Sequence, residues 1–394
     1  MNSPKISFNK NSQAWAFIYF SEAFEFLNNK AISRVDLNYQ EGSVKCIHYG
    51  DILTKFPQIL DSSSQLLPYI NDDVDVENIS TLKTGDIVIA DTAEDYAVGK
   101  SIEVCITDDS KVIAGLHTMS CRPKKNFASG FLGYYINSTA YHGQLRRLVT
   151  GTKVYAINKS EIRKTNLHFP CVEEQQKIAA FFTALDEKIF NTKQKLDCLT
   201  SIKRKLLKDL ISFTTRFRNE KGEVFQEPEI TKLEDLCAVF KSGNGITSDY
   251  INQEDEYPVY GGNGVRGFTS TYTHDGLFVL IGRQGALCGN VRLISGKNYV
   301  SEHAIAVQAN HSNSTEWIRY LLEAMNLNSL SESSAQPGLS AKKLKELTVC
   351  VPCLDEQLKI AEFLTNIELK INIYSKKKEV LMRLKHAFMQ QMFV

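Results

Sequence analysis

The feature that most constrains this chain is a helical segment that occurs twice. Residues 170–211 begin PCVEEQQKIAAFF and residues 352–393 begin PCLDEQLKIAEFL, so the copies are 352 − 170 = 182 residues apart and align without a gap. Identical residues recur along both copies, among them Glu174/Glu356, Gln175/Gln357, Lys177/Lys359, Ile178/Ile360, Ala179/Ala361 and Phe181/Phe363. A repeat at a fixed period indicates duplication of a structural unit. The chain therefore consists of two related halves, each ending in the same segment.

Each copy of the repeat predicts one long helix. Positions at alternating steps of three and four are mostly apolar, with Thr192 and Lys203 as the polar members of the first copy; the apolar ones are Ile178, Phe182, Leu185, Ile189, Leu196, Leu199, Leu206 and Leu210, and again Ile360, Leu364, Ile367, Ile371, Tyr374, Leu381, Phe388 and Met392. This is the spacing of a coiled-coil seam. A proline precedes each copy, and acidic residues follow in the first turn, where the helix dipole favours negative charge. We expect the two helices to pack on each other in antiparallel fashion, with pseudo-twofold symmetry.

The segments between the helices predict two mixed globular domains. Short β-rich runs such as Ser101-Ile-Glu-Val-Cys-Ile and Gly276-Leu-Phe-Val-Leu-Ile-Gly occur in both. We therefore expect an α/β (α+β) chain in the order globular domain 1–169, long helix 170–212, globular domain 213–351 and long helix 352–394.

The charges are distributed unevenly although the formal net charge is only +1. One basic stretch runs from Ser110 to Lys164, where Glu161 is the single acid. A milder one runs from Tyr257 to Val300, where Asp275 is the single acid. Two basic faces follow from this pattern. They fit a surface that contacts phosphates, and they fit ordinary variation of surface charge equally well.

Two glycine motifs resemble nucleotide-binding loops but lack the required context. In YPVYGGNGVRGF, the glycines Gly262, Gly264 and Gly267 match a dinucleotide fingerprint, which requires a helix directly afterwards. The following Phe-Thr-Ser-Thr-Tyr-Thr is typical of a strand, so we predict a tight loop between short strands. Gly99-Lys100-Ser101 resembles the end of a P-loop, but it too runs into a strand.

Other catalytic and metal-binding patterns are also incomplete. The nine prolines include no adjacent pair, so the Pro-Pro core of an amino-methyltransferase site is missing. Asp186-x-Lys188 and Glu368-x-Lys370 lie inside the helices, where charges usually form a solvated face. Nine scattered cysteines with one CxxC, Cys350 to Cys353, favour reduced thiols over disulfides or zinc. With no apolar run of membrane-spanning length, we expect a cytoplasmic, non-catalytic chain without a membrane segment, cofactor or metal of its own.

The duplicated Pro-x-x-x-Glu-Gln-x-Lys-Ile-Ala, the order of domains and helices, and the run Leu82-Lys-Thr-Gly-Asp-Ile-Val-Ile-Ala resemble the specificity subunit of type I restriction-modification systems. The resemblance implies that each globular part is a target recognition domain for double-stranded DNA. The helices would hold the two domains at a fixed separation, so that the site has two parts and a nonspecific spacer. Implied partners are two methyltransferase subunits, which carry S-adenosylmethionine, and two restriction subunits, where present, which use ATP and Mg²⁺.

Candidate contact residues follow from side-chain chemistry, because Arg, Asn and Gln suit base edges and Lys suits phosphate. The DNA-binding candidates are His117, Arg122, Lys124, Lys125, Arg146 and Arg147 in the first domain, and Tyr260, Asn263, Arg266, Arg283, Gln284 and Arg292 in the second. The candidates for binding methyltransferase subunits are Glu174, Gln175, Ile178, Phe181, Glu356, Gln357, Ile360 and Phe363. For each candidate, a surface charge, loop packing or the coiled-coil core is the competing explanation.

Three other classes of protein stay open from the sequence. A coiled-coil scaffold would need only the helices and would not bind random DNA at any salt concentration. A specificity module of another restriction-type system would share the recognition domains. An enzyme with an unrecognised nucleotide site would bind nucleotide as an isolated chain.

Overall fold

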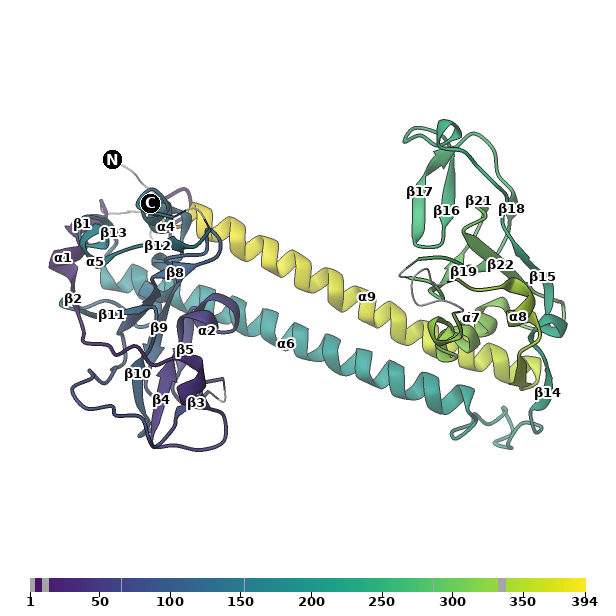
Figure 1. Ribbon diagram of the computed structural model, residues 1–394, viewed down its shortest axis with the longest axis horizontal. Coiled ribbons are helices and arrows are strands. Elements are labelled where there is room, and N and C mark those ends of the chain that lie inside the picture. The colour runs from purple at the N-terminus through teal and green to yellow at the C-terminus, as the bar shows by residue number, and fades with distance from the viewer. Residues whose placement is uncertain (1–3, 9–13, 65, 152, 286, 332–337) are drawn as a thin grey trace. The chain divides into compact units, whose positions relative to one another are not determined.

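The computed structural model describes residues 4–8, 14–64, 66–151, 153–285, 287–331 and 338–394. The chain divides into two compact units. Unit 1 comprises residues 1–193 and 376–394, and unit 2 comprises residues 194–375. Each unit contains one globular part together with a stretch of both long helices (Figure 1).

The two predicted long helices are confirmed. Helix α6 spans Val172–Ile211 and helix α9 spans Leu354–Gln391. Each begins shortly after the proline that opens its repeat, and each carries two acidic residues in its first turn. Most of the predicted seam faces inward; Ile178, Phe182, Leu210, Ile360, Leu364 and Met392 are at most 2% exposed. The α/β fold class with two long helices is therefore correct.

In unit 1 the globular part is built on two sheets and several short helices. The five-stranded sheet has the order β2 (Phe24–Phe26), β11 (Thr118–Pro123), β7 (Ile87–Ala90), β9 (Ser101–Cys105) and β5 (Ile59–Asp61). The four-stranded sheet has the order β10 (Lys111–Ala114), β4 (Val44–Ile47), β6 (Tyr69–Ile70) and β3 (Leu37–Asn38). Two small ribbons pair β1 (Ala16–Tyr19) with β13 (Asn166–Phe169) and β8 (Thr92–Ala93) with β12 (Tyr155–Ala156). The helices are α1 (Phe20–Ala23), α2 (Tyr49–Thr54), α3 (Phe131–Tyr135), α4 (Thr139–Arg146) and α5 (Lys159–Ile162).

Unit 2 repeats this plan with fewer elements. One sheet has the order β15 (Cys237–Ser242), β22 (Ala304–Ala309), β19 (Phe278–Gly282) and β20 (Val291–Ile294). The other has the order β17 (Gly264–Thr269), β16 (Tyr257–Gly261), β21 (Lys297–Val300) and β18 (His274–Asp275). A ribbon of β14 (Glu229–Lys232) and β23 (Thr348–Val351) corresponds to β1 and β13, because each closes its globular part just before a long helix. The helices are α7 (Thr315–Ala324) and α8 (Ala341–Lys345).

The long helices are paired by the same ion pair in both units. In unit 1, Lys385 Nζ on α9 lies 2.6 Å from Asp186 Oδ1 on α6. In unit 2, Lys203 Nζ on α6 lies 2.7 Å from Glu368 Oε1 on α9. Adding the repeat offset of 182 converts Asp186 to position 368 and Lys203 to position 385. The interaction is therefore made twice with the chain order exchanged, as an isologous two-fold interface requires. This agrees with the predicted antiparallel pairing.

In each unit, a tyrosine of the globular part donates a hydrogen bond to the acid of this ion pair. Tyr134 OH on α3 donates to Asp186 Oδ2 at 2.9 Å, and Tyr320 OH on α7 donates to Glu368 Oε2 at 3.1 Å. In unit 2, Arg319 adds a bidentate contact to Glu368, with both N–O distances 2.6 Å. The expectation of a solvated face at Asp186 and Glu368 was wrong. Their side chains are 28% and 23% exposed, because they anchor the globular parts to the helices.

Glu368 should make unit 2 sensitive to acid. Burial raises the pKa of Glu368, but the hydrogen bonds and charges of Arg319 and Lys203 outweigh burial and hold it at about 2, below its ordinary value of 4.5. The ionised carboxylate therefore stabilises the fold fully above about pH 4.5, and this contribution is lost as the pH falls toward 2. We expect Glu368→Gln to lower the free energy of unfolding by about 3 kcal/mol at pH 7 and by about half as much at pH 3.

Urea unfolding of the full chain at the two pH values measures this difference. Glu362→Gln, at an exposed position of the same helix, is the matched control and should change stability little. An equal loss at pH 7 and pH 3 for Glu368→Gln would contradict the assignment to the carboxylate charge.

Candidate nucleic-acid interface

The glycine-rich loop of unit 2 is a β-hairpin, as predicted. Strands β16 and β17 pair antiparallel and meet at Gly261 and Gly264. Gly264 and Gly267 have φ angles of +122° and +151°, a region that side chains disfavour. A Cβ atom on Gly267 would lie 2.5 Å from Ile251 Cγ2. These glycines therefore serve the turn and a close approach of the chain, and no helix follows them to receive a pyrophosphate.

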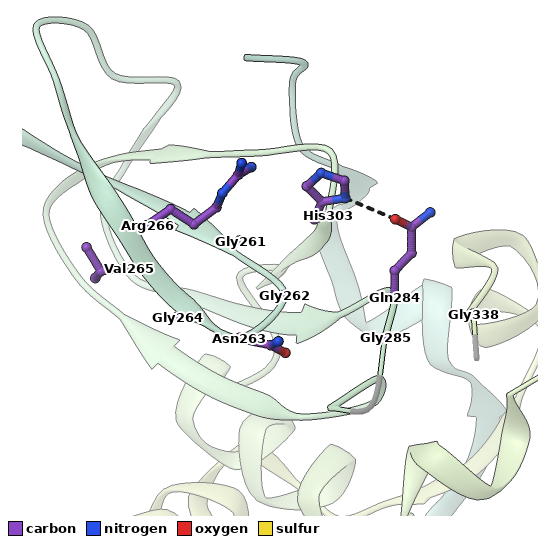
Figure 2. Close-up of a pocket in the computed structure, with 10 residues that line it drawn as sticks. All are labelled: Gly261, Gly262, Asn263, Gly264, Val265, Arg266, Gln284, Gly285, His303 and Gly338. Carbon is purple, nitrogen blue, oxygen red and sulfur yellow. Dashed lines mark hydrogen bonds between the residues drawn. The ribbon is translucent and has the colours of Figure 1, made fainter. Parts of the chain in front are cut away.

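This hairpin forms one wall of a pocket of about 560 Å³ in unit 2. Three of the predicted residues, Asn263, Arg266 and Gln284, line the pocket, together with Gly261, Gly262, Gly264, Val265, Gly285, His303 and Gly338. Figure 2 shows the Arg266 side chain on one side and a hydrogen-bonded pair, His303 and Gln284, on the other. The pocket thus combines a guanidinium, two amides and an imidazole, all groups that hydrogen-bond to base edges.

The remaining predicted residues of unit 2 lie around this pocket. Tyr260 is half-buried in β16, and its carbonyl oxygen accepts a hydrogen bond from Ser301 N at 2.9 Å. Arg283 directly precedes Gln284. Arg292, on β20, lies beneath the hairpin turn, because a Cβ atom on Gly264 would be 3.5 Å from Arg292 Nη2. The pocket and its surroundings therefore bring together residues from β16, β17, β20 and the loop after β19.

His303 is a pocket residue that the sequence analysis did not select. Its Nδ1 lies 3.0 Å from Gln284 Oε1, and its Nε2 lies 3.2 Å from Glu302 Oε1. A single histidine in one sequence does not by itself indicate a functional site. The available signal was that both globular segments place a histidine directly before a buried strand, His117 before β11 and His303 before β22.

In unit 1, Arg122 is held inside its own domain. Its Nε and Nη2 lie 2.9 Å and 2.7 Å from the two carboxylate oxygens of Asp86, which is 1% exposed. Nη2 also donates to Thr81 O at 3.1 Å. These contacts neutralise a buried acid, which favours a structural role for Arg122 over contact with DNA.

The other predicted residues of unit 1 are more accessible. Lys124 is exposed and donates to Ser21 O at 3.1 Å, and Lys125 lines a pocket of about 330 Å³ that Lys83 and Arg122 also line. Arg146 and Arg147 are exposed at the end of α4, on a different element. His117 is half-exposed, with Nδ1 3.3 Å from Thr92 Oγ1 and 3.4 Å from Asp91 Oδ1. The described structure therefore spreads these residues over several elements.

Six of the eight residues predicted to bind partner subunits are buried, with at most 3% exposure: Glu174, Gln175, Ile178, Glu356, Gln357 and Ile360. Gln175 accepts a hydrogen bond from Ala128 N at 3.0 Å, and Gln357 accepts one from Ser314 N at 2.9 Å, so both tie a globular part to a helix start. Glu356 pairs with Arg216 at 2.8 Å. These contacts favour a structural role for the buried six.

The two phenylalanines among the predicted partner-binding residues keep some accessible surface. Phe181 is half-buried and packs edge-on against Phe388, with ring centroids 5.0 Å apart. Phe363 is 38% exposed and packs against Phe217.

The described ranges contain neither a candidate metal site nor a membrane-spanning helix. Within them, no cluster of three or more His, Cys, Asp or Glu side chains is arranged to hold a metal ion. No helix among these residues is both long enough and apolar enough to cross a bilayer. All nine cysteines are free thiols.

Comparison with known proteins identifies the class. Residues 13–201 and 226–383 match a family described as the type I restriction modification DNA specificity domain, and the chain belongs to this family. It is similar to the specificity subunit of the type I restriction enzyme EcoprrI from Escherichia coli, with 32% identity over 252 residues. That alignment spans 61% of this chain and 61% of the relative. A putative type I specificity subunit of MjaX from Methanocaldococcus jannaschii is 22% identical over 371 residues, 86% of this chain and 85% of that one.

Solved structures share the fold. The specificity subunit of a type I restriction-modification system from M. genitalium superposes with a TM-score of 0.67 at 17% identity, covering 100% of this chain and 99% of that chain. A chain from a structural study of type I complex assembly and conformational transition superposes with a TM-score of 0.56 at 18% identity, covering 95% and 96%. The resemblance inferred from the sequence is confirmed.

Two of the basic residues that line the unit 1 pocket, Arg122 and Lys125, should respond differently to substitution. Arg122→Ala leaves the buried Asp86 without its partner, so we expect a loss of about 3 kcal/mol in the free energy of unfolding. Lys125→Ala removes an exposed charge, so stability should change little, while binding to random duplex DNA weakens and the slope of log K against log salt falls by about 1.

Urea unfolding and a salt titration of DNA binding separate these two effects. Unchanged stability in Arg122→Ala, together with a loss of DNA affinity, would indicate instead that Arg122 contacts DNA.

Proposed function

We propose that this chain is the non-catalytic DNA-specificity subunit of a type I restriction-modification enzyme, in which each unit reads one half of a two-part site. The observation that carries the proposal is the ion pair made twice with exchanged chain order, at Asp186–Lys385 and Lys203–Glu368. A two-fold interface suits a protein that meets two half-sites on a duplex. The globular parts have different loop sequences, so the two half-sites would differ.

The long helices would set the spacing between the half-sites. Helix α6 runs without interruption through 40 residues and α9 through 38. At a rise of 1.5 Å per residue, such helices have lengths of about 60 Å. A continuous helix resists bending, which supports a spacer of constant length.

Catalysis would belong to partner subunits. S-adenosylmethionine would be carried by two methyltransferase subunits, and ATP and Mg²⁺ by two restriction subunits where these are present. The relatives named above are specificity subunits, which supports this division. With cellular DNA as the target, this work would take place in the cytoplasm.

We infer that one of the two methyltransferase subunits docks on an apolar stripe of α9. Leu358, Leu369 and Ile373 are 49%, 53% and 63% exposed and lie on one face of the helix, since they are spaced by 11 and 4 residues. Exposed apolar clusters of this kind mark interaction surfaces. Their repeat counterparts on α6 are Gln176, Glu187 and Asn191, so this stripe belongs to one of the two helices.

The two-part site can be tested by mapping methylation. The chain is co-expressed with its type I methyltransferase subunit in a host without DNA methylation, and modified adenines are located by single-molecule sequencing. We expect a two-part motif with a constant gap, and exchange of residues 213–351 for those of a relative should alter one half only. A stable complex that methylates no motif, or a contiguous one, would favour the coiled-coil scaffold.

The docking stripe can be tested separately. We expect Leu369→Asp with Ile373→Asp to reduce the co-purified methyltransferase subunit from two copies per chain to about one, because two charges would be buried against an apolar partner surface. Glu187→Gln, at the position equivalent to Leu369 on α6, is the control. Undiminished co-purification with the double variant would place the contact elsewhere.

A further inference from the structure

Two histidines occupy the same place in the two units. His117 directly precedes β11 and His303 directly precedes β22, and the offset between them is 303 − 117 = 186. The same offset, 320 − 134 = 186, separates the two tyrosines that contact the helix ion pairs. The histidines are therefore equivalent positions of the duplicated fold.

The backbone around both histidines is held by the same hydrogen bonds. Asp91 N donates to His117 O at 3.1 Å, and Arg283 N donates to His303 O at 3.0 Å. Each of these donors is the first residue after the strand beside the histidine's strand, β7 in unit 1 and β19 in unit 2.

A third loop is hydrogen-bonded to the segment just before each histidine. Gly115 N, two residues before His117, donates to Ile47 O at 3.0 Å, and Ser301 N, two residues before His303, donates to Tyr260 O at 2.9 Å. Ile47 ends β4, and Tyr260 lies at the end of β16. In both units, three loops therefore meet: one after β4 or β16, one after β7 or β19, and one before β11 or β22.

The histidine ring bonds to the same position of the neighbouring loop in both units. His117 Nδ1 lies 3.3 Å from Thr92 Oγ1, and His303 Nδ1 lies 3.0 Å from Gln284 Oε1. Thr92 and Gln284 are each the second residue after their strand, β7 in unit 1 and β19 in unit 2. The two strands pair in equivalent registers, with the last residue of each opposite the residue that follows the histidine. The imidazole thus fixes the orientation of a side chain that is polar in both units but different in each.

We propose that these three-loop junctions are the base-reading centres, and that the pairs Thr92–His117 and Gln284–His303 determine sequence specificity on double-stranded DNA. This inference rests on the proposed function and assigns it to particular residues. The shared backbone supplies position, while the variable side chains supply hydrogen-bond patterns that differ between the half-sites.

The two centres differ in chemistry although each has a carboxylate near its histidine, Asp91 in unit 1 and Glu302 in unit 2. Unit 1 places the carboxylate of Asp91 beside Thr92 and His117, and carboxylates accept hydrogen bonds from the exocyclic amines of cytosine or adenine. Unit 2 places Arg266 in the pocket with Gln284 and His303, and a guanidinium donates to the acceptor edge of guanine. The first centre therefore suits a base with an exocyclic amine, and the second suits guanine.

The test uses the full chain in complex with its methyltransferase subunit and selects duplexes from a library of random double-stranded DNA. Gln284→Ala should reduce discrimination at one base position of one half-site about tenfold, and Thr92→Ala should do the same in the other half-site. Glu229→Gln and Asp73→Asn, at exposed positions of the two units, are the matched controls. Gln284→Asn keeps the amide and moves it, and should change the preferred base.

The outcomes separate this inference from the function on which it rests. A wild-type complex that selects no two-part motif overturns the proposed function. A wild-type two-part motif that stays unchanged in all three loop variants, or that weakens equally in both halves, overturns the assignment of the junctions. Loss confined to the half-site of the altered unit supports it.

Discussion

The pairing of an acid on one long helix with a lysine on the other is the interaction on which the arrangement of each unit depends. The acid also accepts a hydrogen bond from a tyrosine of the globular part, Tyr134 in unit 1 and Tyr320 in unit 2. One carboxylate therefore connects α6, α9 and the globular part at a single point. Partly buried ion pairs contribute little net stability compared with apolar packing, but they specify register and orientation. The repetition of this pair fixes which turns of the helices face each other.

The identities within the repeat have a structural explanation. Gln175 and Gln357 each accept a backbone N–H from the globular part and donate to the proline carbonyl that precedes the helix, at 2.8 Å and 2.9 Å. Such a side chain holds the direction in which the helix leaves its domain. The duplicated residues thus preserve the connection between domain and helix, whereas the loop residues that contact the two histidines, Thr92 and Gln284, differ between the halves.

The parts of this structure that depend on the local spacing of residues could be predicted from the sequence. The long helices, their antiparallel pairing and the strand-turn-strand form of the Gly262–Gly267 loop were predicted because spacing and turn chemistry are properties of neighbouring residues. The roles of Arg122 and Glu368 were not, because their partners are distant in the chain. Asp86 precedes Arg122 by 36 residues, and Arg319 precedes Glu368 by 49. His303 was missed for the same reason, because its role becomes visible only through its contact with Gln284.

The helix contacts and the loop residues have separate roles, which explains how one fold can recognise different DNA sequences. The loop residues Asp91 and Thr92 in unit 1 correspond to Arg283 and Gln284 in unit 2, yet the backbone bonds beneath them are the same. Changing a side chain at these positions outside the buried core costs little folding free energy, because the buried strands and the helix ion pairs keep their partners. A substitution at the helix ion pair disturbs three elements at once. Specificity can therefore vary at the junctions while the surfaces that hold the domains and partner subunits remain constant.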